Sequence, residues 1–199
     1  MLKLYFAPGS SSMAPHIALH EVGALHEIGT AFETQALSFA NKDHRRPAYL
    51  AINPEGKIPT LLIDGRRLTE VAGILYYLAK RYPGAELMPT GDPEAEAQVI
   101  SWMSFIAATV HPARPKGIEY ATNIFGLADQ RLSRNDWAVG GRYSIADIHL
   151  FRLFWRFSGS LSPPKGSFPN LEAHYDRMMR RPAVQKTIEI ESAVGYELP

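Results

Sequence analysis

The stretch Ile58 to Glu70, with the sequence IPTLLIDGRRLTE, contains the strongest local fold signal of this chain. Two runs of strand-forming residues, Thr60 to Ile63 and Arg67 to Thr69, flank the dipeptide Asp64-Gly65. Asp-Gly between two such runs is typical of a type I′ turn, because both central positions of that turn need a positive φ. The stretch therefore predicts an antiparallel hairpin that leads directly into a helix over residues 70–82.

Upstream of the hairpin, the pattern predicts a strand, a helix, a strand and a helix. Residues 2–7 (LKLYFA) are apolar and aromatic and predict a strand. Helical spacing then runs from Ser11 or Ser12 to Val22, and Gly23 is the expected stop. We expect a second strand from about His26 to Glu33 and a short helix from His44 to Asn53. The strand–helix–strand order predicts a parallel pair with a right-handed crossover.

Downstream of the hairpin, the chain reads as a linker followed by helices only. Residues 83–93 are rich in Pro and Gly, which favours a linker. The chain is therefore expected to hold a mixed α/β domain over residues 1–82 and a helical domain over residues 94–199. The expected helices of the second domain span residues 94–111, 118–132, 144–157, 170–181 and 183–191.

The composition excludes several functional classes. With 199 residues, 46% of them hydrophobic, and a net charge of +1, the chain resembles ordinary globular proteins and has no basic block for a nucleic acid. It contains no cysteine, so a disulfide and a cysteine nucleophile are excluded. No apolar run suits a membrane span or a signal peptide, which predicts a cytoplasmic protein. His16 and His20 lack a third ligand, so we expect no metal.

The segment PGSSSMAPH, residues 8–16, lies between the first expected strand and the first expected helix. Its serines, Ser10, Ser11 and Ser12, fit a flexible loop, and they also fit a catalytic helix N-terminus. Unpaired N–H groups and partial positive charge make a helix N-terminus favourable for an anion.

Four segments, in this order and at these distances, resemble the cytosolic glutathione transferases, and most closely the bacterial beta-class branch of that family. The resemblance implies a thioredoxin-like N-terminal domain, a helical C-terminal domain and a homodimer. It also implies an enzyme that uses glutathione as co-substrate, without a covalently bound cofactor, against a hydrophobic electrophile or a peroxide. The segments are YFAPGSSSMAPHIALHEVG (5–23), AINPEGKIPTLLIDG (51–65), LTEVAGILYYLAKRYP (68–83) and YSIADIHLF (143–151).

The resemblance also implies a glutathione site. The Ile58-Pro59 bond is expected to be cis, with the backbone of Ile58 paired to the cysteinyl part of glutathione. The N–H of Val71 would bind the γ-glutamyl carboxylate, and the carboxylate of Glu70 would bind the ammonium group. A trans proline on an edge strand and a Glu70 that only stabilises the helix dipole are the alternatives. Asn53 and Lys57 complete the expected glutathione-binding set.

The expected catalytic group is a serine. Ser11 aligns with the cysteine of the beta class, and a serine cannot form a mixed disulfide, which favours nucleophilic attack or peroxide reduction by a bound thiolate. Ser10 or Ser12 would supply the hydroxyl if the loop turned differently. Tyr5 resembles the tyrosine of other classes, although its place in the strand equally fits the core. His111 would lie near the sulfur, or would only satisfy a helix C-terminus.

Two further expectations concern the helical domain. Trp102 and Phe105 would line the electrophile pocket. Ser144 and Asp147 form a capping box with a purely structural role, so Asp147→Ala should lower stability by about 1 kcal/mol or more.

Two other functions fit the same segments. One is a non-catalytic ligand-binding or protein-interaction module, which the serine in place of cysteine favours. The other is a glutathione-dependent isomerase, because the isomerase branch has a related Ser-Ser-Cys-Ser segment.

Overall fold

The computed structural model describes residues 1–24, 32–133 and 135–197 and divides the chain into two compact units. The first unit comprises Met1–Ala85 together with the chain from Pro182 on, and the second comprises Glu86–Arg181. The helix α8 (Pro182–Val194) thus belongs with the N-terminal residues, which differs from the expected helical domain of residues 94–199. The physical reason is that α8 packs against α1 (Met13–Ala24).

The first unit contains the predicted mixed sheet, with the strand order β2-β1-β3-β4. Its strands are β1 (Leu2–Phe6), β2 (Glu33–Ala36), β3 (Thr60–Ile63) and β4 (Arg66–Thr69). β1 and β2 run parallel, whereas β1–β3 and β3–β4 are antiparallel. The second strand was expected over residues 26–33. It begins at Glu33 instead, and residues 26–31 lie outside the described part of the chain.

The Asp-Gly hairpin is confirmed. Asp64 and Gly65 connect β3 and β4 and have φ angles of 49° and 81°, as a type I′ turn requires. The hairpin places Thr69 opposite Thr60, so the start of the following helix lies next to the start of β3.

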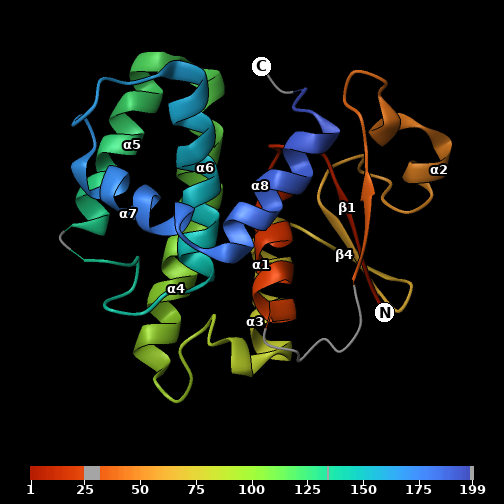
Figure 1. Ribbon diagram of the computed structural model, residues 1–199, viewed down its shortest axis with the longest axis horizontal. Helices are drawn as coiled ribbons and strands as arrows, with labels where there is room; N and C mark the ends of the chain where they lie inside the picture. The colour runs from red at the N-terminus through yellow and green to blue at the C-terminus, as the bar shows by residue number, and fades with distance from the viewer. Residues whose placement is uncertain (25–31, 134, 198–199) are drawn as a thin grey trace. The chain divides into compact units, whose positions relative to one another are not determined.

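Helices α1 and α3 (Val71–Arg81) cover one face of the sheet, and α8 packs against α1 (Figure 1). The stop expected at Gly23 is wrong, because α1 continues to Ala24. Met13, Ile17 and Leu19 are fully buried and form the core-facing side of this helix. The short helix expected over residues 44–53 is interrupted. It consists of a 3₁₀ turn, η1 (Asp43–Arg45), and of α2 (Pro47–Leu50).

The interruption has a local cause. Arg46 precedes Pro47 and is extended, with ψ of 148°. A residue before proline is disfavoured in the helical region, because the proline ring clashes with its backbone. A 3₁₀ turn, η2 (Pro83–Ala85), follows α3 where the linker was expected to begin.

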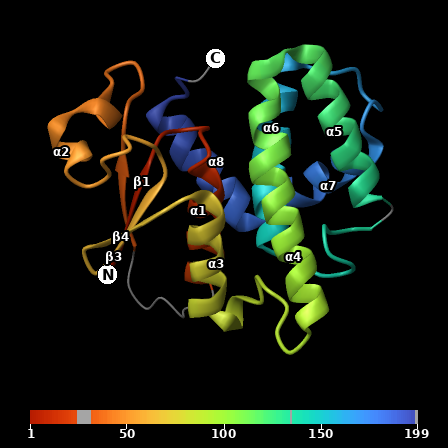
Figure 2. The ribbon, with the colours of Figure 1, turned by 180° about the vertical axis from the view of Figure 1, so that it is seen from behind.

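The second unit is helical, as predicted (Figure 2). The helix expected over residues 94–111 is divided into α4 (Pro93–Phe105), a π-helical turn η3 (Ile106–Val110) and a 3₁₀ segment η4 (His111–Lys116). Pro112 explains the change of hydrogen-bond pattern, because proline lacks an N–H and its ring clashes with the carbonyl four residues earlier. The unit continues with α5 (Ile118–Leu132), α6 (Ile145–Leu161) and α7 (Pro169–Met179).

None of the helices in the described residues combines the length and the apolarity needed to cross a bilayer.

Candidate functional site

The loops that carry the expected glutathione-site residues meet at one edge of the sheet. Phe6 pairs with Ala36, Tyr5 with Thr60, and Thr60 with Thr69. The ends of β1, β2 and β4 and the start of β3 therefore lie at the same edge. This edge brings together the serine loop after β1, the proline loop before β3 and the helix start after β4.

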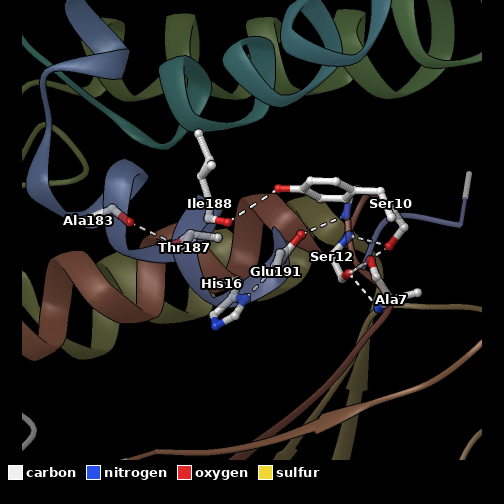
Figure 3. A network of polar contacts seen from close by, with 10 residues as sticks. Ala7, Ser10, Ser12, His16, Ala183, Thr187, Ile188 and Glu191 are labelled. Atoms are coloured by element: carbon white, nitrogen blue, oxygen red, sulfur yellow. Dashed lines mark hydrogen bonds and ion pairs between the residues drawn. The ribbon is translucent and has the colours of Figure 1, made fainter. Parts of the chain in front are cut away.

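The hydroxyl groups of Ser10 and Ser12 are engaged inside the serine loop (Figure 3). Ser12 Oγ accepts from the N–H of Ala7 and donates to its carbonyl, each at 3.1 Å. The hydroxyl groups of Ser10 and Ser12 also share a hydrogen bond of 2.7 Å. The two serines are only 5% and 0% exposed, so neither presents its hydroxyl openly to a ligand.

Ser11 is the most exposed of the three serines and is half-buried. Its carbonyl accepts from the N–H of Ala14 at 3.4 Å, so its backbone already belongs to the start of α1. Tyr5 is half-buried on β1, and its ring centroid lies 5.5 Å from that of Tyr49.

Glu191 on α8 fixes the serine loop from outside, which the sequence analysis missed. Its Oε2 accepts from the N–H of Gly9 at 2.7 Å, and its Oε1 lies 2.9 Å from Nδ1 of His16 (Figure 3). The side chains of His16 and Glu191 are both 0% exposed. The available sequence signal was weak: Glu191 follows Val184 and Thr187 at helical spacing on the buried face of α8.

The rings of His16 and His20 stack on each other. Their centroids are 5.1 Å apart, and burial, then the charges of His16 and Lys186, lower the pKa of His20 to about 4. Among the described residues, no group of three or more His, Cys, Asp or Glu side chains is arranged to hold a metal ion.

The proline loop has the backbone that the resemblance implies. The Ile58-Pro59 peptide is cis, and within the described chain the N–H and C=O of Ile58 make no hydrogen bond. Asn53 is 1% exposed, and its amide donates to the carbonyl of Lys57 at 2.9 Å and to Thr60 Oγ1 at 3.2 Å. Both amide hydrogens of Asn53 are thus used to shape the loop.

Glu70 has an unusual backbone at the start of α3. Its φ is 68° and its ψ is 127°, and its side chain makes no capping bond. Non-glycine residues with positive φ are uncommon and often mark functional sites.

The pKa of Lys57 is raised, first by a hydrogen bond to Glu55 and then by the charges of Glu55 and Glu70. Lys57 and Glu70 are exposed, and the N–H of Val71 has no partner in the described chain.

The second unit holds the other expected site residues. His111 is exposed at the start of η4. Nearby, the burial of His149, followed by the charges of His111 and Arg152, lowers the pKa of His149 to about 3. The guanidinium of Arg131 lies 4.6 Å from the ring centroid of Trp102 and 4.9 Å from that of Phe105. Trp102 is 3% exposed, so its ring is already covered.

The second unit also contains the capping box at the start of α6. Ser144 Oγ accepts from the N–H of Ala146, and the Asp147 carboxylate accepts from the N–H of Ser144 at 2.9 Å. The carboxylate also accepts from the N–H of Ala138 at 2.7 Å and lies 3.0 Å from Nε2 of His174. Asp147 therefore joins three segments of the unit, which the local motif alone did not indicate.

A mixed β2-β1-β3-β4 sheet with a cis-proline before β3 defines a thioredoxin-like domain, here followed by a helical domain. Residues 4–86 match the sequence family described as glutathione S-transferase, N-terminal domain, and residues 100–182 match the corresponding C-terminal domain. This chain belongs to the glutathione S-transferase family.

Known members are similar over nearly their full length. The chain is 29% identical to glutathione S-transferase GstA of Escherichia coli O157:H7, covering 96% of this chain and 98% of that protein. A bacterial beta-class glutathione S-transferase of Sphingomonas chungbukensis is 31% identical, with a TM-score of 0.80 and coverage of 95% and 98%. A sphingomonad glutathione S-transferase complexed with glutathione is 30% identical, with a TM-score of 0.82 and coverage of 96% and 98%.

A shorter match concerns the isomerase branch. A maleylacetoacetate isomerase of Rhizobium meliloti (strain 1021) is 34% identical over 57% of this chain and 53% of that protein.

Proposed function

We propose that the protein binds glutathione along the loop-bearing edge of the sheet and activates its thiol for attack on a hydrophobic electrophile or a peroxide. The observation that carries the proposal is the meeting of the loops of four strands at this edge. Three strand spacings of about 4.8 Å make the edge about 14 Å long. An extended tripeptide spans about 11 Å, and the γ-linkage of glutathione adds to this length.

The proposed binding mode uses the backbone groups that have no partner in the described residues. The N–H of Val71 binds the γ-glutamyl carboxylate at the start of α3, where the helix dipole favours an anion. The exposed carboxylate of Glu70 binds the ammonium group. The N–H and C=O of Ile58 pair with the cysteinyl residue, as an added strand would. Lys57 lies beside this site, and Asn53 holds the loop in shape.

In the proposed mechanism the hydroxyl of Ser11 donates a hydrogen bond to the thiolate. Ser10 and Ser12 are bonded to each other and buried, whereas Ser11 is half-buried, which supports Ser11 as the donor. The thiol proton leaves to solvent, and the thiolate then forms a bond to the electrophilic carbon while the leaving group departs with its electron pair. His111 is proposed as a second polar group near the sulfur, and its role is separable by mutation.

The other family features also enter as proposals. We leave Trp102 and Phe105 out of the electrophile site, because Arg131 covers their rings. By the resemblance to cytosolic members, the protein is proposed to act as a homodimer in the cytoplasm.

The test of the proposed function uses Val71→Pro. Proline is tolerated at the first position of a helix, so this change removes the proposed N–H donor and leaves the start of α3 in place. Isothermal titration should show glutathione binding at least about tenfold weaker than in the wild type, since a hydrogen bond to a charged group is lost. Val71→Ala keeps the N–H and is the matched control. Equal affinities for Val71→Pro and Val71→Ala would contradict the binding mode.

A second candidate function is glutathione-dependent isomerisation. The partial match to a maleylacetoacetate isomerase favours it. An isomerase adds the thiolate to a double bond and releases it after rotation, so no glutathione is consumed. Incubation with a cis-configured unsaturated dicarboxylate should then give the trans product at constant glutathione concentration. Net loss of glutathione with an aryl halide supports the transferase instead. Binding without either reaction supports a non-catalytic module.

A further inference from the structure

The segment after α8 places a carboxylate in the loop that follows β2. Glu197 Oε1 accepts from the hydroxyl of Ser38 at 2.7 Å, and Oε2 accepts from the N–H of Ala40 at 3.0 Å. Hydrogen bonds from Ala40, then Ser38, and also from the N–H of Phe39, lower the pKa of Glu197. One hydroxyl and one backbone N–H thus hold a single carboxylate, with the N–H of Phe39 next in the chain, and hydroxyl and backbone N–H donors are common in binding sites for anions.

This nest, defined as Ser38, Phe39 and Ala40, is held in place independently of Glu197. Ser38 Oγ accepts from the N–H of Asn41 at 2.9 Å. The N–H of Ser38 donates to the carboxylate of Asp43 at 3.0 Å, and the N–H of Asp43 donates to the carbonyl of Ser38 at 2.9 Å. The nest is therefore a preformed receptor.

The nest lies at the same sheet edge as the proposed glutathione site. Leu37 follows β2, and its N–H donates to the carbonyl of Phe6 at 2.8 Å, which ties this loop to the end of β1. The strand order gives the direction of the ligand. The γ-glutamyl end is at β4, the cysteinyl part is between β3 and β1, and the remaining glycine end extends toward β2.

We propose that this nest binds the glycine carboxylate of glutathione and that Glu197 occupies it when glutathione is absent. The proposal rests on the proposed glutathione site and adds its regulation. Glutathione and the segment after α8 compete for one set of donors. Glu197 is exposed, so water can replace its bonds and the exchange needs no opening of a core.

The competition has a calculable size. A carboxylate tethered by a few residues acts at an effective concentration in the millimolar range. The apparent dissociation constant of a ligand equals the intrinsic constant divided by the fraction of protein with the site open. If Glu197 fills the nest for about nine-tenths of the time, glutathione binds about tenfold more weakly than it would to the open nest.

The first measurement is glutathione affinity by isothermal titration for Glu197→Ala and Glu189→Ala. Glu189 is an exposed α8 residue paired with Lys186, so its variant matches the change in charge. Glu197→Ala should bind glutathione about three- to tenfold more tightly, whereas Glu189→Ala should match the wild type. With glutathione esterified at its glycine carboxyl, the gain should vanish. An unchanged or weaker affinity of Glu197→Ala, or a gain that persists with the ester, would overturn the proposal.

The second measurement needs no glutathione and uses acetate as the probe. The amide resonance of Ala40, followed by NMR, should shift with added acetate and saturate in Glu197→Ala. It should respond only weakly in the wild type, where the nest is filled. An Ala40 resonance that does not respond in Glu197→Ala overturns the nest as a carboxylate site. If glutathione binds to no variant while acetate saturates the nest, the proposed function fails and the carboxylate site stands.

Discussion

At the level of single residues, the three adjacent serines differ in their hydrogen bonds and in their exposure. Ser10 and Ser12 hold the loop and are buried, while Ser11 is the most exposed of the three serines. Glu191 holds the same loop by a bond to Gly9 and ties it to α1 through His16. The loop that lies at the proposed thiol site is therefore fixed from both sides.

Glu191→Ala should be strongly destabilising. It removes the buried carboxylate that accepts from the N–H of Gly9 and contacts Nδ1 of His16, and each buried polar group left without its partner costs about 1–3 kcal/mol. Chemical denaturation measures this loss. Glu189→Ala, on the exposed face of the same helix, should cost less than about 1 kcal/mol. Similar losses for the two variants would show that Glu191 does not fix the loop.

The sequence pointed to the serines but not to Glu191 and His16, which hold their loop in place. Ser10 to Ser12 stand out because three serines follow a strand and precede a helix. His16 and Glu191 are 175 positions apart, and no local pattern relates them. The part that Asn53 plays in shaping the loop was missed for a similar reason. The hydrogen bonds that use its amide involve Thr60 in β3, which becomes a neighbour only after the loop has folded.

At the level of helices and strands, the predictions succeeded where a few neighbouring residues determine the backbone conformation. The hairpin follows from Asp64-Gly65, and the start of α6 follows from Ser144 and Asp147, which are three positions apart. The stop at Gly23 failed, because α1 includes Gly23 and Ala24 and a glycine in a helix weakens it without necessarily ending it. The helix expected over residues 94–111 becomes π-helical and then 3₁₀ near Pro112. The spacing of the apolar residues could not predict this change, because it does not depend on the missing N–H of a proline.

Asp147→Ala should cost more than a capping box alone. Its carboxylate accepts from the backbone of Ser144 and of Ala138 and bonds to His174, all in a fully buried place. Leaving these donors unsatisfied should lower the free energy of unfolding by about 3 kcal/mol or more. Urea denaturation measures it, with the exposed Asp136→Ala as the control. A loss of only about 1 kcal/mol would reduce Asp147 to a helix cap.

At the scale of the whole molecule, each unit buries a histidine that is neutral in the folded state. The pKa of His20 in the first unit is lowered to about 4, and that of His149 in the second to about 3, in both cases mainly by burial. The unfolded chain protonates its histidines near pH 6.5. Between pH 6.5 and 4 the unfolded state thus binds more protons, so stability falls as the pH decreases.

Denaturation at a series of pH values tests this dependence. The wild type should lose stability from pH 6.5 toward pH 4, and His149→Gln should have a smaller slope because one of the titrating groups is removed. His20→Gln should reduce the slope in the same direction. A slope that neither substitution changes would mean that other groups cause the acid sensitivity.

Titration of thiolate absorbance shows directly whether Ser11 stabilises the thiolate of bound glutathione. A free thiol of this kind has a pKa of about 8.5, and binding to the wild type should lower it. In Ser11→Ala, glutathione should still bind, its thiol pKa should return toward the free value, and kcat/KM should fall by about 100-fold. Ser10→Ala, as the control, should keep most of the pKa shift. The same lowered thiol pKa in Ser11→Ala as in the wild type would contradict the account.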